Sequence, residues 1–188
     1  MVPIIMMLMG KKNQNIHLWI SIFIVLSGLL ILLNPNVAQF TTGDLLTFGC
    51  SISFATHIIY QGKYLIHKIN IYNFFFVQMA VATLLFFIGA FFEYQFLNIE
   101  LKWNYTVFMG LSITGFLATF VAILIMVWAQ KIISPIQTAM IFTLEPVFAG
   151  MYNHFFTEHI LTNWGIFSGF IIVSGILYHE YMINIEVK

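Results

Sequence analysis

The sequence predicts an all-α protein that crosses a lipid bilayer several times as a polytopic membrane helix bundle. About 61% of its 188 residues are hydrophobic and only 7% are charged, whereas an ordinary soluble domain has roughly a quarter charged residues. The apolar residues also form long runs, not the short alternating pattern of barrel strands. Helices satisfy their own backbone hydrogen bonds in lipid, so runs of this kind are expected to be spanning helices.

Six runs approach the roughly 20 residues that a spanning helix needs. We expect about five of them to span, which allows for one run that fails. The runs cover, in order, residues 16–33, 44–60, 72–92, 107–129, 135–156 and 164–181. They are ended by Asn34-Pro35-Asn36, Gln61 to Lys63, Glu93, Gln130-Lys131 and Thr157 to His159, while the last run leads into the C-terminal residues.

A short apolar stub, residues 1–10, precedes the first run. Ten residues are too few to cross about 30 Å of hydrocarbon. Lys11 and Lys12 follow the stub, whereas a signal peptide places its positive charge first. We therefore expect the stub to be the tail of a helix whose beginning is missing.

The seven lysines predict the orientation of the chain. If six spans follow the stub, every lysine except Lys102 falls on one side of the membrane. Positive loops stay in the cytoplasm. We therefore expect a cytoplasmic C-terminus in an integral membrane protein, and the expected location is the bacterial inner membrane.

Two similar segments suggest an inverted repeat. SIFIVLSG at Ser21–Gly28 and SGFIIVSG at Ser168–Gly175 are identical at five of eight positions. They lie five spans apart, which is an odd number, so they are expected to point in opposite directions through the membrane. The loop charge preceding the two copies is also reversed, as in an inverted-topology repeat.

Glu145 is the main candidate for a functional residue. It lies near the middle of the fifth run, where a charge costs roughly 2.5–3.5 kcal/mol on insertion scales. Pro146 follows it and removes a helical hydrogen bond. Transporters build their sites at broken helices near the midplane. The alternative is a protonated Glu145 that only bonds a neighbouring helix.

Four further polar residues could line a substrate path. Thr138 and Tyr152 share a helical face with Glu145, which suggests a polar stripe along a pore. His57 in the second run and Gln78 in the third could each line a cavity. The alternative for both is a hydrogen bond between helices.

No pattern in the sequence indicates a catalytic, metal or cofactor site. HFFTEH, at His154–His159, is one residue too long for the inverted zinc motif, and H-E-x-x-H is absent. No G-x-S-x-G and no phosphate-binding glycine loop occurs. An intramembrane enzyme is therefore disfavoured. The formal net charge of zero gives no basic face for nucleic acid.

Two segments resemble a known transporter family. SPIQTAMIFTLEPVFAGMYNHFFTEHILTNWGIFSGFIIVSGIL, at Ser134–Leu177, resembles the closing hairpin of EamA-type transporters of the drug/metabolite transporter superfamily. Its Leu144-Glu145-Pro146 centre is the most specific part. GDLLTFGCSISFATHIIYQGKYL, at Gly43–Leu65, resembles the opening helix of the family's second repeat. The arginine that is usual at the hairpin is absent, because this chain reads Phe156-Thr157-Glu158-His159 there.

The resemblance implies ten helices in two inverted five-helix repeats. Residues 1–34 would be the end of the first EamA-like repeat, and residues 43–182 would be the whole second repeat. The first three to four helices would then be missing. Because family members bind substrate between the two repeats, we expect the chain not to transport alone.

The function implied by the resemblance is transport of small metabolites or drugs by alternating access, as a permease or exporter. The expected partners are the lipid bilayer and a small-molecule substrate. The alternative is a truncated remnant that moves nothing. A homo-oligomer or another protein would then have to supply the missing helices.

The lysine distribution yields a direct test of topology. A phosphatase that is active only in the periplasm should be inactive when fused after Lys188, because that end is predicted to be cytoplasmic. The same reporter in the loop that contains Lys102 should be active and serves as the control. An active fusion at Lys188 would reverse the predicted orientation.

Overall fold

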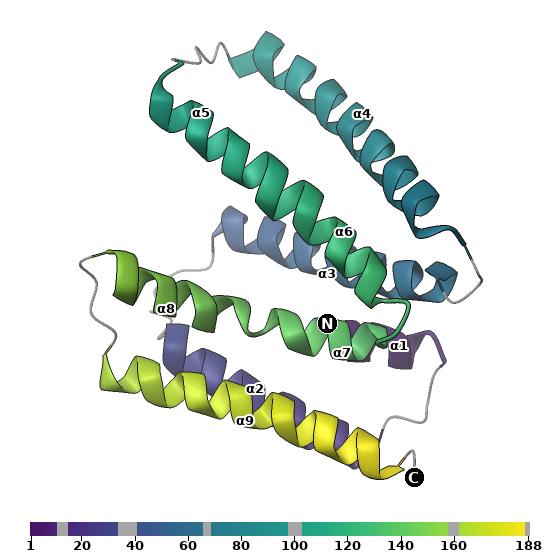
Figure 1. Ribbon diagram of the computed structural model, residues 1–188, viewed down its shortest axis with the longest axis vertical. Coiled ribbons are helices and arrows are strands. Elements are labelled where there is room, and N and C mark those ends of the chain that lie inside the picture. Colours follow the sequence, from purple (N-terminus) through teal and green to yellow (C-terminus); the bar gives the residue numbers. More distant parts are fainter. Residues whose placement is uncertain (11–14, 34–40, 66–68, 98–102, 158–161, 187–188) are drawn as a thin grey trace. The chain divides into compact units, whose positions relative to one another are not determined.

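The computed structural model describes residues 1–10, 15–33, 41–65, 69–97, 103–157 and 162–186. All regular secondary structure in these ranges is helical (Figure 1), which confirms the all-α prediction. The elements are α1 (Val2–Leu8), α2 (Ile16–Leu33), α3 (Thr42–Leu65), α4 (Ile71–Leu97), α5 (Tyr105–Ser112), the π-helix η1 (Ile113–Val121), α6 (Ala122–Ala129), α7 (Pro135–Phe142), α8 (Glu145–Phe156) and α9 (Asn163–Glu186).

Four helical segments of the described chain are long and apolar enough to cross a membrane. They cover Ile16–Leu33, Ile71–Tyr94, Tyr105–Ala129 and Asn163–Ile185, and they coincide with the first, third, fourth and sixth predicted runs. The second run lies within the continuous helix α3, and the fifth run is divided between α7 and α8. The result is a polytopic helical membrane bundle, as predicted.

The chain forms two compact units, one of residues 1–60 with 134–188 and one of residues 61–133. In the second unit, α5, η1 and α6 follow one another without a break. The Thr119 hydroxyl donates to the Thr114 carbonyl five residues earlier at 2.8 Å, the spacing of a π-helix. Phe75 of α4 contacts Phe120 edge-on and is buried in a cluster with Leu65 and Val127. Apolar packing thus joins α4 to α6.

In the first unit, α2 and α9 lie side by side (Figure 1). A Cβ atom added to Gly28 would lie 2.8 Å from Ile172 Cγ1, and one added to Gly175 would lie 2.7 Å from Val25 Cγ2. Gly28 and Gly175 are equivalent in the two similar segments, and so are Val25 and Ile172. Each glycine is therefore contacted by the β-branched residue at the equivalent position of the other segment.

The two helices run in opposite directions. The His17 ring at the start of α2 is hydrogen-bonded to the Tyr178 hydroxyl near the end of α9, at 2.7 Å. Ser21 and Ser168 are fully buried at equivalent positions. Their hydroxyls donate to carbonyls three residues earlier, at 2.7 and 2.8 Å. This arrangement has the direction that an inverted repeat requires, and the division into repeats at 1–34 and 43–182 stays a prediction.

Helix α7 is central to the first unit. A cluster that includes Val2 of α1 and Ile58 of α3 packs against Ile136 and Ala139 of α7. A second cluster joins Met140 of α7 to residues of α2 and α9, and Ile136 also packs against it. Through these two clusters α7 links α1 and α3 on one side to the α2–α9 pair on the other.

The close approach of α2 and α9 predicts a position-specific cost of added volume. Gly28→Val should destabilise the protein by about 1–3 kcal/mol, because the new side chain would overlap Ile172 and approach its backbone nitrogen. Gly89→Val in α4 is the matched control, since a Cβ there meets nothing within 4 Å. The measurement is the midpoint of thermal unfolding in detergent. Equal midpoints for the two variants would contradict close packing at Gly28.

Candidate functional site: a cavity beside a broken helix

A break in the helix separates α7 from α8. Pro146 has no N–H, so the Phe142 carbonyl one turn earlier cannot receive its usual helical hydrogen bond. The Thr143 N–H bonds to the Met140 carbonyl at 3.1 Å, which is a three-residue spacing and a tighter turn. The Thr143 hydroxyl donates to the same carbonyl at 2.5 Å. The break expected beside Glu145 is therefore present one turn before Pro146.

The other end of α7 is fixed by a capping box. The Ser134 hydroxyl accepts from the Gln137 N–H at 3.2 Å, and Gln137 Oε1 accepts from the Ser134 N–H at 2.9 Å. Pro135 occupies the first helical position, where a missing N–H costs no intrahelical bond. Helix α7 is thus an eight-residue half-helix with a defined start and a defined end.

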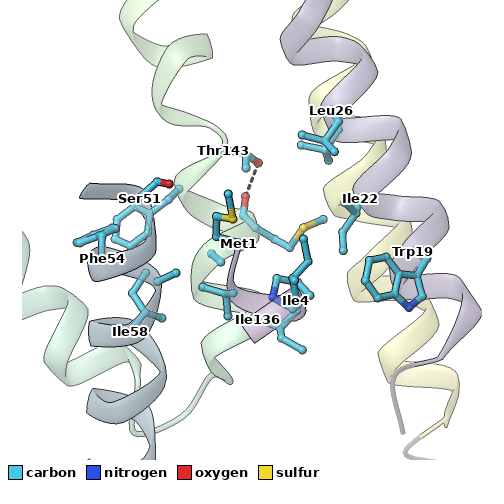
Figure 2. A pocket seen from close by; sticks show the side chains of 17 residues that line it. Met1, Ile4, Trp19, Ile22, Leu26, Ser51, Phe54, Ile58, Ile136 and Thr143 are labelled. Atoms are coloured by element: carbon cyan, nitrogen blue, oxygen red, sulfur yellow. Dashed lines mark hydrogen bonds between the residues drawn. The ribbon is translucent and has the colours of Figure 1, made fainter. Parts of the chain in front are cut away.

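A cavity of about 340 Å³ lies beside this break, among α1, α2, α3 and α7 (Figure 2). Figure 2 shows Phe54 of α3 and Trp19 of α2 on opposite sides of it. Most lining side chains are apolar. The hydroxyls of Ser51 and Thr143 at the lining donate to backbone carbonyls. Its volume is in the range of small-molecule sites, roughly 300–1,000 Å³, and its chemistry suits a small, mainly apolar body.

A second apolar cavity, of about 330 Å³, lies on the far side of the break, between α8 and α9. Pro146 lines it, together with Gly150, Gly165 and Gly169. A Cβ at Gly169 would reach only ordinary contact, 3.6 Å, with Val147. Unfilled space therefore borders the broken helix both before and after the break.

The structure places the predicted residues of the fifth run at different sites. Glu145 is exposed in the first turn of α8, where the positive end of the helix dipole favours a negative charge. Tyr152 is exposed and stacks on Phe156. Thr138 is buried in α7, and its hydroxyl donates to the Ser134 carbonyl at 3.0 Å. The break falls between Thr138 and Glu145, so the three residues do not share one continuous helical face.

His57 and Gln78 belong to different units. His57 is half-buried in α3 and stacks on Phe54, with ring centroids 6.2 Å apart. Because Phe54 lines the 340 Å³ cavity, His57 lies one side chain behind its wall. Gln78 is half-buried in α4 of the second unit. The assignment of both residues to a substrate path stays a prediction.

Sequence reasoning missed the residues that line the 340 Å³ cavity, such as Trp19, Phe54, Phe142 and Thr143. An apolar side chain in a spanning run has the same signature whether it faces lipid or a cavity. Only Thr143 carried a signal, since it lies three residues before Pro146. Glu158 and His159 of HFFTEH lie outside the described residues. Among the described residues, no group of three or more His, Cys, Asp or Glu could hold a metal ion.

A helical bundle with spanning segments, a broken helix and adjoining apolar cavities is the architecture of a polytopic membrane protein. Residues 41–179 match the EamA-like transporter family, and the chain belongs to that family. It is similar to an uncharacterized transporter of Archaeoglobus fulgidus, with 29% identity over 138 residues. The match covers 73% of this chain and 43% of that protein, so the chain spans less than half of its relative. No solved structure matches the chain.

If Pro146 causes the break, replacing it should repair the helix. Pro146→Ala restores an N–H for the Phe142 carbonyl, so amide exchange at residues 143–148 should slow by up to about tenfold. Hydrogen exchange measured by mass spectrometry is the readout. Pro135→Ala is the control and should change nothing, because that proline lies at the start of α7. Unchanged exchange in Pro146→Ala would show that tertiary contacts hold the break.

Proposed function

We propose that the protein is a transporter of small metabolites or drugs that works by alternating access, with the 340 Å³ cavity as part of its substrate path. The observation that carries this proposal is the position of the cavity directly beside the break between α7 and α8. Discontinuous helices next to a binding space are the elements from which transporters build their sites. Membership of the EamA-like transporter family supports the same conclusion.

The break gives the cavity a wall that can move. Ile136, Ala139 and Met140 of α7 contribute to the lining, and Thr143 lies at the end of that wall. A rotation of α7 about Thr143 and Leu144 would carry the three lining residues with it. The cavity would then change its shape and its access, which is the requirement for exposing a site first to one side of the membrane and then to the other.

The chemistry of the lining supports one class of substrate for this proposal. Trp19, Phe54 and Phe142 provide flat apolar contacts, and the lining hydroxyls of Ser51 and Thr143 are already donated to carbonyls. A substrate with a small apolar body fits such a space better than a sugar or a polyanion, whose polar groups would lose their water without replacement. We propose that Glu145, the first residue of α8 past the break, meets a polar or cationic end of the substrate.

The protein works in the bacterial inner membrane with a cytoplasmic C-terminus, a proposal supported by the lysine distribution. Its mode of action is translocation, not covalent chemistry. Since the match covers 43% of its relative's length, the proposed transporter includes helices beyond residues 1–188, from the same polypeptide, a second copy or a partner protein.

The proposal is tested by flux into vesicles. Purified chain is reconstituted alone and after co-expression with the first four helices of a related ten-helix transporter. The probes are tritiated leucine, tritiated phenylalanine and tetraphenylphosphonium. Saturable flux of a probe in either sample supports transport, and the sample that shows it reveals whether further helices are needed. Correctly inserted protein that moves none of the three probes in either sample would contradict the proposal.

Two variants connect the flux to the site. Ala139→Phe should reduce flux at least about tenfold, because the ring occupies the cavity, whereas Ala80→Phe on the exposed part of α4 should not. Glu145→Gln should abolish flux without preventing insertion, and Glu93→Gln is its control at an exposed position. If Ala139→Phe transports like Ala80→Phe, the cavity is not on the path. If Glu145→Gln transports normally, Glu145 has only a structural role.

A further inference from the structure

A second polar cluster lies at the start of α7, at the opposite end of this half-helix from the break. Gln137 Nε2 donates to both carboxylate oxygens of Glu180 in α9, at 3.2 and 3.0 Å. The amide oxygen of Gln137 is already bound to the Ser134 N–H in the capping box. One side chain therefore both caps α7 and ties its first turn to α9.

The charge on Glu180 strengthens this connection in two ways. A carboxylate offers an acceptor on each oxygen, and the Gln137 donor lies within range of both. The carboxylate also faces the first turn of α7, where the helix dipole is positive and attracts a negative charge. Protonation of Glu180 would cancel the charge and occupy one oxygen with hydrogen, so both contributions would weaken together.

Glu180 lies in the last part of α9 and is only partly buried. Its side chain is 37% exposed, whereas the neighbouring His179 side chain is 5% exposed. His179 Nδ1 lies 3.7 Å from Glu180 Oε1, too far for a hydrogen bond, and has no hydrogen-bond partner among the described residues. On α9 the titratable residues Tyr178 and Tyr181 are also close to it in sequence, and His17 of α2 is bonded to Tyr178. Residues 135–142 of α7 contain no titratable side chain.

We propose that Glu180 is a proton-binding site of this transporter and that protonation releases the first turn of α7 from α9. A proton from water forms an O–H bond with one carboxylate oxygen, and the charge of the side chain falls from −1 to zero. Helix α7 is then held mainly by apolar contacts and by its joint at Thr143 and Leu144. Its release moves the cavity wall, which couples proton binding to access. The coupling rests on the proposed function, whereas the release does not.

The release is tested without any transport measurement. Protection of the α7 amides against hydrogen exchange is measured across a pH series on the full chain in lipid nanodiscs, after correction for intrinsic exchange rates. In the wild type, protection should fall about tenfold on acidification. Glu180→Gln, which mimics the protonated acid in size and charge, should show the low value at every pH. Glu93→Gln, at an exposed position of α4, should respond as the wild type does.

A second variant keeps the test independent of the Glu180 substitution. Gln137→Leu leaves the carboxylate in place but removes its donor, so α7 protection should be low and insensitive to pH. A pH response that persists in Glu180→Gln, or α7 protection that is flat with pH in the wild type, would overturn the proposal.

The flux assay then tests the coupling separately. If the vesicles transport a probe, Glu180→Gln should remove the dependence of that flux on a pH gradient. Flux that keeps its dependence in this variant would refute Glu180 as the coupling site while leaving the proposed function intact. A pH-dependent release of α7 without flux of any probe would leave the release intact and refute the proposed function.

Discussion

One missing N–H, at Pro146, lies beside the point at which the first unit of this protein is divided into half-helices. At Pro146 the chain cannot complete the hydrogen bond to Phe142, and in lipid no bulk water is available to replace it. The backbone tightens at Thr143 and Leu144, with the Thr143 hydroxyl bonded to the Met140 carbonyl. What would have been a rigid span becomes two half-helices. The 340 Å³ cavity lies along the first half-helix, α7, and the hydrogen bonds from Gln137 to Glu180 connect the first turn of α7 to α9.

The environment decides which contacts restrain α7. In water, its apolar contacts would dominate, but lipid tails are as apolar as the side chains they replace, so exchanging protein for lipid changes the free energy little. The hydrogen bonds between Gln137 and Glu180 add a polar restraint at the first turn of α7. The α2–α9 pair is different, because Gly28 and Gly175 bring the two backbones close enough for extensive dispersion contact. A closely packed helix pair beside a half-helix that ends at a break is the arrangement that a moving cavity wall needs.

The sequence predicted those features that depend on local chemistry. Hydropathy identified the spanning helices, Pro146 identified the break, and the similarity of Ser21–Gly28 to Ser168–Gly175 anticipated two segments of opposite direction. It did not predict contacts between distant residues. Gln137 and Glu180 are separated by 43 positions, and no periodicity specifies which polar side chains meet. Thr138 does not share the predicted helical face with Glu145 and Tyr152, because helical spacing does not continue through a break.

The two similar segments differ at a few positions, and these differences show where polar groups occur in the α2–α9 pair. If the register of the two similar segments is extended, His17 corresponds to Trp164, and Tyr178 corresponds to Ile31. His17 and Tyr178 form a hydrogen bond at one end of the pair. The corresponding residues at the other end, Trp164 and Ile31, are apolar. Glu180 lies two residues beyond Tyr178, at the same polar end. If the packing of α2 and α9 were fully two-fold symmetric, both ends of the pair would have the same groups. The polar groups lie at one end, so the pair is asymmetric. Glu180, the proposed proton-binding residue, lies at that polar end.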